Sequence, residues 1–209
     1  MPENAGDLVS RAHLIVALYG YLLGSIPFGL VLTRLAGLGD VREIGSGNVG
    51  ATNVLRTGNK PLALLTLLLD AGKGGIAAMI AYHLYPGGPS GLDFAIVAGL
   101  AAVIGHNFPV WLKFEGGKGV ATTFGTLLAI SWQVALAACV TWAVIAALFR
   151  YSSLAALVAL AAAPFYAWFM GFEKVAVLAA LLAILGFIRH YENIRRLLKG
   201  EESKIGRKK

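Results

Sequence analysis

The polar segment 45–56, which reads GSGNVGATNVLR, combines glycines, neutral hydrogen-bond donors and one arginine. Glycine lets backbone N–H groups approach an anion closely, and a following helix would add its positive N-terminal end. Arginine can bind two phosphate oxygens at once. We therefore expect an anion-binding loop formed by Ser46, Asn48, Gly50, Asn53 and Arg56. Residues 45–50 also match the pattern G-x-G-x-x-G of dinucleotide-binding proteins. That interpretation is disfavoured, because no buried strand precedes the pattern and no βαβ unit surrounds it. A glycine-rich turn between two helices is the structural alternative.

A second polar segment, 105–122, contains Lys118 in a Gly-Gly-Lys-Gly turn that opens an apolar helix. It is not a Walker A loop, since Lys113 stands where that pattern needs a glycine and Gly119 replaces the Ser or Thr. We expect Lys118, flanked by Gly117 and Gly119, to contact a phosphate. For Lys113 we favour an interfacial, snorkelling position. His106 has the acid–base range for a functional role, with a structural histidine at a span end as the alternative.

Two further polar groups occur at 150–153 and 189–196. Ser152 and Ser153 either cap the helix that follows or face a ligand, and the sequence does not decide between these. His190 and Asn193 are three residues apart and therefore share a helix face, with Arg189 nearby. The cations further along, Arg195, Arg196 and Lys199, are expected to contact anionic headgroups.

The pair Asp70 and Lys73 is also three residues apart but lies within an apolar run, where unpaired charges are costly. We expect mutual neutralisation. No acidic cluster or ligand spacing predicts a metal, and the single cysteine, Cys139, excludes disulfides. No residue five positions after a histidine is Asp, so the His-x-x-x-x-Asp signature of soluble-type glycerolipid acyltransferases is absent.

The composition indicates a membrane protein. Hydrophobic residues are 57% and charged residues 14% of the 209 residues, and the mean hydropathy is +0.71. A soluble domain usually carries about 25% charged residues, and a small domain leaves much of its surface in water. An ordinary soluble enzyme is therefore excluded, and so is a disordered chain. The predicted fold class is an all-α polytopic membrane protein.

Apolar runs of about 20 residues can cross a bilayer as helices. They cover roughly 8–36, 61–85, 92–112, 119–149, 151–171 and 173–190. The polar break Ser131-Trp132-Gln133 divides the longest run into about 119–131 and 133–149, which predicts seven transmembrane helices. The expected organisation is a single transmembrane catalytic domain over 1–198 and a solvated basic tail over 199–209.

The formal net charge of +7 reflects membrane topology. With seven spans, one side of the membrane holds most of the Lys and Arg residues: Arg34, Arg42, Arg56, Lys60, Lys113, Lys118, Arg150 and the eight from Arg189 onward. The other side holds Arg11 and Lys174. The positive-inside rule then places the N-terminus outside and the tail in the cytoplasm. No base-stacking pattern accompanies these cations, so no nucleic-acid partner is expected.

The sequence resembles the bacterial acyl-phosphate:glycerol-3-phosphate acyltransferase family (PlsY) over nearly its whole length. The resemblance is carried by the segments 24–29 (GSIPFG), 46–53 (SGNVGATN) with Arg56, 105–106 (GH), 116–119 (GGKG), 190–193 (HYEN) and 197–201 (LLKGE). This sequence departs from the family at Tyr191, where the family usually has Arg.

The resemblance implies a seven-span enzyme of the bacterial inner membrane with its active site facing the cytoplasm. It implies acyl transfer from acyl-phosphate to the sn-1 hydroxyl of glycerol 3-phosphate, without an acyl-enzyme, giving lysophosphatidate and inorganic phosphate. Expected partners are these substrates, membrane lipids and an enzyme that supplies acyl-phosphate; no cofactor is expected, and a monomer is the working expectation. The implied catalytic residues are Ser46, Asn48, His106, Lys118 and His190, and the implied substrate-binding residues are Gly50, Asn53, Arg56, Gly117, Gly119, Ser153 and Asn193.

Two points stay open from the sequence. The proton of the attacking hydroxyl is taken either by a substrate phosphate, as the family implies, or by His106 or His190 as general base. A transporter of phosphorylated metabolites also explains spans, glycines and cations, but it predicts inverted symmetry and midplane binding residues, whereas the polar motifs here gather at one face. A lipid-scaffolding protein would leave the Asn and His residues unexplained.

Overall fold

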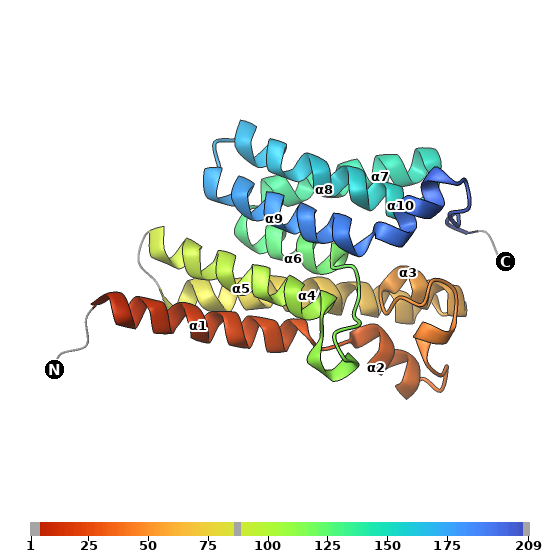
Figure 1. The fold of residues 1–209 in the computed structure, drawn as a ribbon, viewed down its shortest axis with the longest axis horizontal. Coiled ribbons are helices and arrows are strands. Elements are labelled where there is room, and N and C mark those ends of the chain that lie inside the picture. Colours follow the sequence, from red (N-terminus) through yellow and green to blue (C-terminus); the bar gives the residue numbers. More distant parts are fainter. Residues whose placement is uncertain (1–4, 86–88, 207–209) are drawn as a thin grey trace.

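The structure, a computed structural model, describes residues 5–85 and 89–206, and every regular element in these ranges is a helix (Figure 1). The α-helices are α1 (Ala5–Gly24), α2 (Phe28–Leu35), α3 (Ala51–Val54), α4 (Lys60–Leu84), α5 (Pro89–Asn107), α6 (Val120–Ile130), α7 (Trp132–Phe149), α8 (Ser152–Phe169), α9 (Glu173–Arg189) and α10 (Tyr191–Leu198). Single 3-10 turns are η1 (Val41–Glu43), η2 (Leu55–Thr57) and η3 (Val110–Leu112).

Local sequence signals explain where these helices begin and end. The apolar run 8–36, expected as one helix, is divided into α1 and α2 at Ser25–Pro27, because proline has no N–H to donate and disfavours helical backbone in the residue before it. The break at Ser131 is confirmed, since this residue has extended backbone (φ −153°, ψ 92°) between α6 and α7. Asn59 caps α4 by accepting a hydrogen bond from the Leu62 N–H at 3.0 Å.

The helices pack in two layers (Figure 1). One layer contains α1, α4 and α5; the other contains α7, α8 and α9; and α6 packs against both α4 and α7. Small residues bring the helices close together: a Cβ added at Gly24 would clash with the Ala102 carbonyl, and one at Gly125 with the Ala71 carbonyl. Small-residue interfaces of this kind are typical of membrane helices, which gain little from the hydrophobic effect against lipid.

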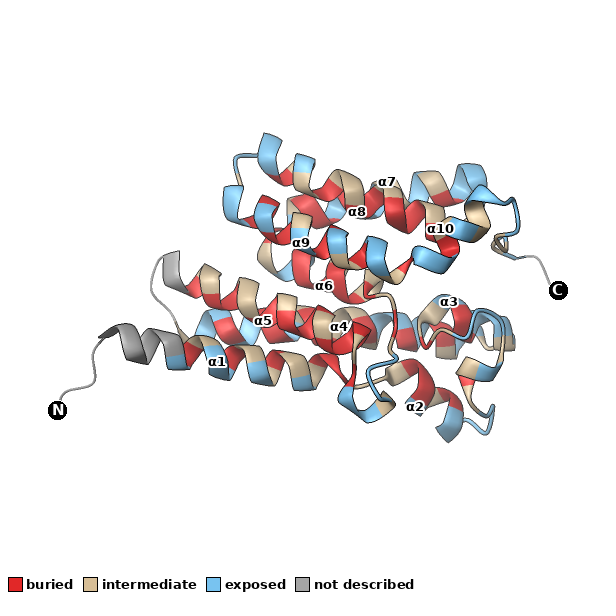
Figure 2. Ribbon diagram, viewed as in Figure 1, coloured by how far each residue is buried: buried red, intermediate tan, exposed pale blue. Residues whose placement is uncertain are grey.

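The outer faces of the helices are apolar and exposed (Figure 2). Large apolar side chains that are more than half exposed include Leu14, Leu68, Phe165, Trp168 and Ile184, and exposed apolar area of this extent marks a surface that contacts lipid or protein. Within residues 5–85 and 89–206, five helical segments are long and apolar enough to cross a membrane, or six if α9 and α10, bent by 64°, count as one. Helix α6 has 11 residues, which is shorter than the roughly 20 that a span requires.

The polar loops gather at one end of the bundle. Figure 1 places α2, α3, the segment after α5, α10 and the C-terminal residues at the end opposite the N-terminus. These parts contain three of the four polar segments that the sequence singles out. The fourth, 150–153, joins them through hydrogen bonds between Ser153 and Glu202 and between Arg150 and Ile205.

Candidate active site

A chain of hydrogen bonds links the glycine-rich turn 116–119 to the C-terminal segment. The Lys118 ammonium donates to the Asn193 side-chain oxygen, and the Asn193 amide nitrogen donates to the Glu202 carboxylate at 2.7 Å. Asn193 is 3% exposed, so both ends of its amide are satisfied within the protein. The structure therefore brings together Lys118 and Asn193, two predicted site residues that are 75 positions apart.

Glu202 accepts two more hydrogen bonds at this point. The Ser153 hydroxyl donates to it at 2.9 Å, and the Arg196 guanidinium at 2.7 Å. Burial raises the pKa of the Glu202 carboxyl, but hydrogen bonds from Arg196, Asn193 and Ser153 outweigh this and hold the pKa below its usual value. The carboxylate is therefore ionised at neutral pH and occupies a cradle of donors at the N-terminal end of α8.

Lys118 is buried enough for its charge to be sensitive to the surroundings. Burial lowers the pKa of the Lys118 ammonium to about 8, while Glu202 opposes this shift and Arg196 and Arg56 add to it. The lysine is thus mostly charged at neutral pH and loses its charge in mildly alkaline solution.

Asn53 organises the first polar loop from its centre. Its amide nitrogen donates to the carbonyl oxygens of Val41, Ile44 and Asn48 at 2.7, 3.1 and 2.8 Å. Its side-chain oxygen accepts from the Ser46 N–H at 3.0 Å and from Arg56 at 3.3 Å. Because Asn53 is 1% exposed, its contacts are structural, and the loop presents Ser46, Asn48 and Arg56 instead. The helix that follows, α3, spans four residues, so it offers only a weak N-terminal dipole.

The first loop and the C-terminal segment also meet. Arg56 donates to the Ser203 hydroxyl at 2.6 Å, and the hydroxyls of Thr52 and Ser152 lie 3.4 Å apart. Further along, the Ile205 N–H donates to the Arg150 carbonyl at 2.7 Å. The expectation of a solvated tail from residue 199 is therefore corrected for 202–205, because the Glu202 carboxylate is drawn to the surrounding donors.

Arg189 holds the turn that carries Lys118. Its guanidinium donates to the carbonyl oxygens of Gly117 and Gly116 at 3.0 and 2.9 Å, and it lies over the Phe108 ring. The Gly116 and Gly117 N–H groups already donate to the Asn107 and His106 carbonyls. Within this part of the chain, the first turn of α6 offers backbone donors for a substrate, because its N–H groups have no partner within the helix.

His106 lies behind this turn and is 6% exposed. A Cβ at Gly117 would clash with its Nε2 atom, and its Nδ1 lies 3.7 Å from an Asp70 carboxylate oxygen. The contacts of His106 therefore connect the loop to α4, which accords with the structural alternative raised from the sequence.

His190 is buried at the junction of α9 and α10, where its Nδ1 donates to the Gly186 carbonyl at 2.7 Å. This bond fixes the ring and leaves Nε2 as the remaining polar atom. His190 and Asn193 are both buried, but His190 lies at the bend between α9 and α10 whereas Asn193 lies within α10.

The Asp70–Lys73 pair is present as expected, with 3.1 Å between Lys73 Nζ and an Asp70 oxygen. Both side chains are almost fully buried, and Lys73 also donates to the Ile26 carbonyl at 2.8 Å, at the break between α1 and α2. The pair therefore links α4 to the break between α1 and α2.

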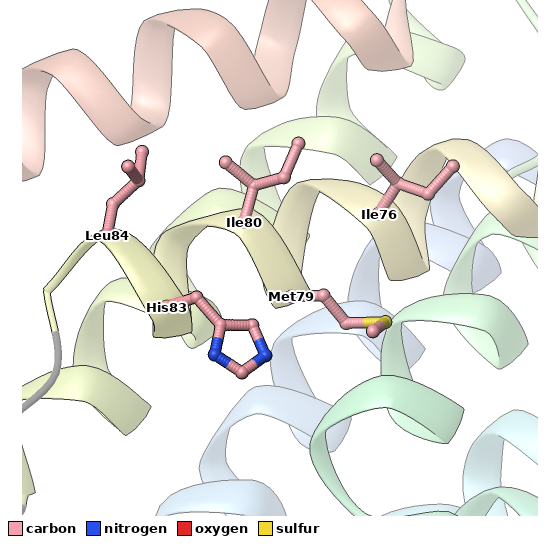
Figure 3. Close-up of a pocket in the computed structure, with 5 residues that line it drawn as sticks. All are labelled: Ile76, Met79, Ile80, His83 and Leu84. Carbon is pink, nitrogen blue, oxygen red and sulfur yellow. The ribbon is translucent and has the colours of Figure 1, made fainter.

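Two concave surfaces lie outside this cluster. The first is an open apolar groove on α4, lined by Ile76, Met79, Ile80, His83 and Leu84 (Figure 3). It belongs to the C-terminal half of α4, whereas Arg56 and Asn53 precede the N-terminal end of that helix. The second is lined by Arg34, Arg42, Trp111, Leu112, Lys113 and Glu115. Lys113 therefore lies on a different surface from Lys118, in agreement with the separate positions expected for them.

Sequence reasoning missed the central role of Glu202 in this cluster and the clamp formed by Arg189. Glu202 stands beside Glu201 in an otherwise basic tail, and this local change of sign was the available signal. Arg189 was placed near the site from its spacing, but nothing in the sequence pairs it with carbonyl oxygens 72 and 73 residues away.

Fold and site together define a class: a helical integral membrane protein with a cationic, hydrogen-bonding site where its polar loops meet. Residues 14–200 match the family described as Glycerol-3-phosphate acyltransferase. The chain is 66% identical to the glycerol-3-phosphate acyltransferase of Rhodospirillum rubrum, covering 93% of this chain and 92% of the relative. It is 64% identical to that of Paramagnetospirillum magneticum, covering 91% and 92%.

Solved structures agree with these relatives. The crystal structure of PlsY (YgiH), an integral membrane glycerol 3-phosphate acyltransferase, in its glycerol 3-phosphate form has a TM-score of 0.86 and 42% identity over 93% of this chain and 96% of that one. The lysophosphatidic acid form of the same protein gives 0.84 and 41%, over 93% and 95%. The chain belongs to the glycerol-3-phosphate acyltransferase family, which confirms the family predicted from its motifs and favours an acyltransferase over a transporter.

Proposed function

We propose that this protein transfers a fatty acyl group from acyl-phosphate to the sn-1 hydroxyl of glycerol 3-phosphate, giving lysophosphatidate and inorganic phosphate. The observation that carries the proposal is the convergence of Arg56, Lys118, Ser153 and Asn193, from four separate segments, around a site that already holds a carboxylate. The Lys118 ammonium and the Arg56 guanidinium, gathered among neutral hydrogen-bond donors, suit a phosphorylated substrate, and PlsY has been solved with both glycerol 3-phosphate and lysophosphatidic acid.

The substrate groups are assigned by charge. The phosphate of glycerol 3-phosphate contacts Lys118 and Arg56, because a guanidinium and an ammonium neutralise its two charges. His190 and Asn193 contact the glycerol part. Ser46, Asn48 and Gly50 lie near the acyl-phosphate head group, and the Gly117–Gly119 turn positions Lys118. The acyl chain lies along the apolar outer faces of the helices, within lipid.

The reaction needs no acyl-enzyme because acyl-phosphate is a mixed anhydride and is already activated. The sn-1 oxygen attacks the acyl carbon, the bond from that carbon to the phosphate oxygen breaks, and phosphate leaves with the electron pair. The hydroxyl proton passes to a substrate phosphate, whose second pKa is near 6. Lys118 and N–H groups of the first turn of α6 stabilise the developing oxyanion, an effect often worth about 3–4 kcal/mol per donor. Substrate phosphate is favoured as the base over His106, which is buried against Asp70 and Gly117.

The proposed topology has seven crossings in the bacterial inner membrane, with the site in the cytoplasm. This count adds α9 and the apolar helix α6, whose 11 residues are fewer than in a full-length span, to the five segments that are long and apolar enough to cross. An odd number of crossings agrees with the N-terminus and the polar loops lying at opposite ends of the bundle (Figure 1). The positive-inside rule assigns the cation-rich loop end to the cytoplasm.

A lipid-product assay on purified protein tests the function directly. Labelled glycerol 3-phosphate is offered with palmitoyl-phosphate in one reaction and palmitoyl-CoA in another. Lysophosphatidate formed only from palmitoyl-phosphate is the expected result, whereas product only from palmitoyl-CoA would overturn the donor. The variant Lys118→Met should abolish activity, and Lys113→Met, on a different surface, serves as its matched control.

A further inference from the structure

We propose that Glu202 is a positioning residue for the glycerol 3-phosphate site: its carboxylate orients the Asn193 amide that holds the Lys118 ammonium and supplies a counter-charge to that ammonium. The inference rests on the proposed function and adds a residue of the C-terminal segment to the machinery. Glu202 itself stays outside the reaction, because its oxygens are already bonded to Ser153, Asn193 and Arg196.

The first step is the direction of the Asn193 amide. An ionised carboxylate can only accept hydrogen bonds, and an ammonium can only donate them. Between Glu202 and Lys118, the Asn193 amide therefore has one favourable orientation, with nitrogen toward the carboxylate and oxygen toward the ammonium, and this is the orientation observed. The opposite orientation would face donor against donor and acceptor against acceptor. Glu202 thus fixes where Asn193 holds the Lys118 ammonium.

The second step is the charge around Lys118. The charged and titratable groups that act on it are Glu202 from the C-terminal segment, Arg196 and Glu192 from α10, Arg56 from η2, and His190 at the junction of α9 and α10. Two of these groups are acidic, Glu192 and Glu202. The Glu192 side chain is 78% exposed, whereas the Glu202 side chain is 7% exposed. A charge near the low-dielectric interior acts more strongly than one in water. Glu202 is therefore the main counter-charge that offsets the burial of Lys118.

A different arrangement would put Glu202 in the place of the substrate phosphate, to be displaced when glycerol 3-phosphate binds. The two arrangements predict opposite effects of neutralising the side chain. If Glu202 competes with substrate, its loss lowers the KM for glycerol 3-phosphate. If Glu202 positions Asn193 and Lys118, its loss raises that KM. The second is favoured because three side chains from two helices, α8 and α10, hold Glu202 at 2.7–2.9 Å.

The experiment measures the KM for glycerol 3-phosphate between about pH 6 and pH 10 on the full chain, with palmitoyl-phosphate as donor. The variants are Glu202→Gln and, as matched control, Glu201→Gln, whose side chain belongs to an exposed residue next in sequence. For Glu202→Gln we expect a KM at least threefold higher at neutral pH. We also expect the rise of KM at alkaline pH to begin about one pH unit lower, as loss of a neighbouring charge predicts. Glu201→Gln should match the wild type.

Four outcomes would overturn the proposal. A lower KM for glycerol 3-phosphate in Glu202→Gln would show that the carboxylate competes with substrate. An alkaline limb of the KM–pH profile that is unchanged in this variant would show that Glu202 has only a structural role. If Glu202→Gln is not recovered folded, Glu202→Asp replaces it. Because aspartate keeps the charge, we expect the KM to rise while the alkaline limb of the KM–pH profile stays at the wild-type pH. A shift of that limb in Glu202→Asp would contradict the inference. A wild-type protein without acyl transfer refutes the proposed function and the inference together, whereas an active wild type with an unshifted Glu202→Gln limb refutes the inference alone.

Discussion

The Arg189 guanidinium donates hydrogen bonds to the carbonyl oxygens of two consecutive glycines, with Nε 3.0 Å from that of Gly117 and Nη2 2.9 Å from that of Gly116. The planar fork of arginine matches two neighbouring acceptors, which a lysine ammonium does not. Through these bonds, the end of α9 sets the position of the turn that carries Lys118. The site is therefore assembled across the two helical layers.

Replacing Arg189 should loosen this turn. For Arg189→Met we expect the KM for glycerol 3-phosphate to rise by about tenfold or more, since hydrogen bonds to charged groups are worth about 1.5–3 kcal/mol. Arg189→Lys should recover only part of the loss. Steady-state kinetics on folded protein provide the measurement. Arg195→Met, at an exposed position of α10, is the control, and an equal effect there would point to general charge loss instead.

The charge of Lys118 should govern the alkaline side of the pH profile. Because its pKa is lowered to about 8, the ammonium is present below that pH and is lost above it. The KM for glycerol 3-phosphate should therefore rise as the pH passes about 8. The substrate phosphate does not contribute there, since its second ionisation lies near pH 6. In Lys118→Arg the alkaline limb should disappear, because a guanidinium stays charged; a limb unchanged in that variant would assign the titration to another group.

Gly117 should not tolerate a side chain. A Cβ at this position would clash with His106 Nε2, so Gly117→Ala must displace either the ring or the turn. We expect at least a tenfold loss of kcat/KM with a lowered melting temperature. Gly72→Ala is the matched control, because the nearest atom to its added Cβ is 4.0 Å away and alanine is favoured over glycine in a helix. Equal losses in both variants would contradict the importance of the His106 contact.

Asn53 should not tolerate replacement by aspartate. Asn53→Asp keeps the acceptor oxygen but loses the donors to Val41, Ile44 and Asn48, and it buries a carboxylate against three carbonyl oxygens. Unsatisfied buried groups cost about 1–3 kcal/mol each, so the melting temperature should fall and activity should be lost. The comparison is Asn59→Ala, which removes one helix cap worth about 1 kcal/mol. That variant should keep the wild-type KM.

The buried pair on α4 should behave as a unit. Either Asp70→Asn or Lys73→Met alone removes one partner and should destabilise the protein by about 3–5 kcal/mol. The double variant should be less destabilised than the sum of the two single variants, because no uncompensated charge remains buried. Thermal unfolding in detergent measures all three. Strictly additive effects would mean that the ion pair at 3.1 Å contributes no coupling.

Much of the architecture could be predicted from the sequence, because its causes are local. Apolar runs predict helices, and Ser131 and Pro27 mark breaks, although only the first of these breaks was expected. The membrane class follows from composition, and the motif segments predict the acyltransferase family, which the relatives confirm. The pairing of Asp70 with Lys73 was predictable too, since three-residue spacing places both on one face of a helix.

Contacts between residues far apart in the chain were decided only by the tertiary structure. The burial of His106 against Asp70, the hold of Arg189 on two carbonyl oxygens and the return of Glu202 to Asn193 all depend on how helices pack. Residue types and local spacing determine which groups can bind an anion. Which of them face one another is set by the packing of small residues between helices, such as Gly125 against Ala71, and that arrangement has no local signature in the sequence.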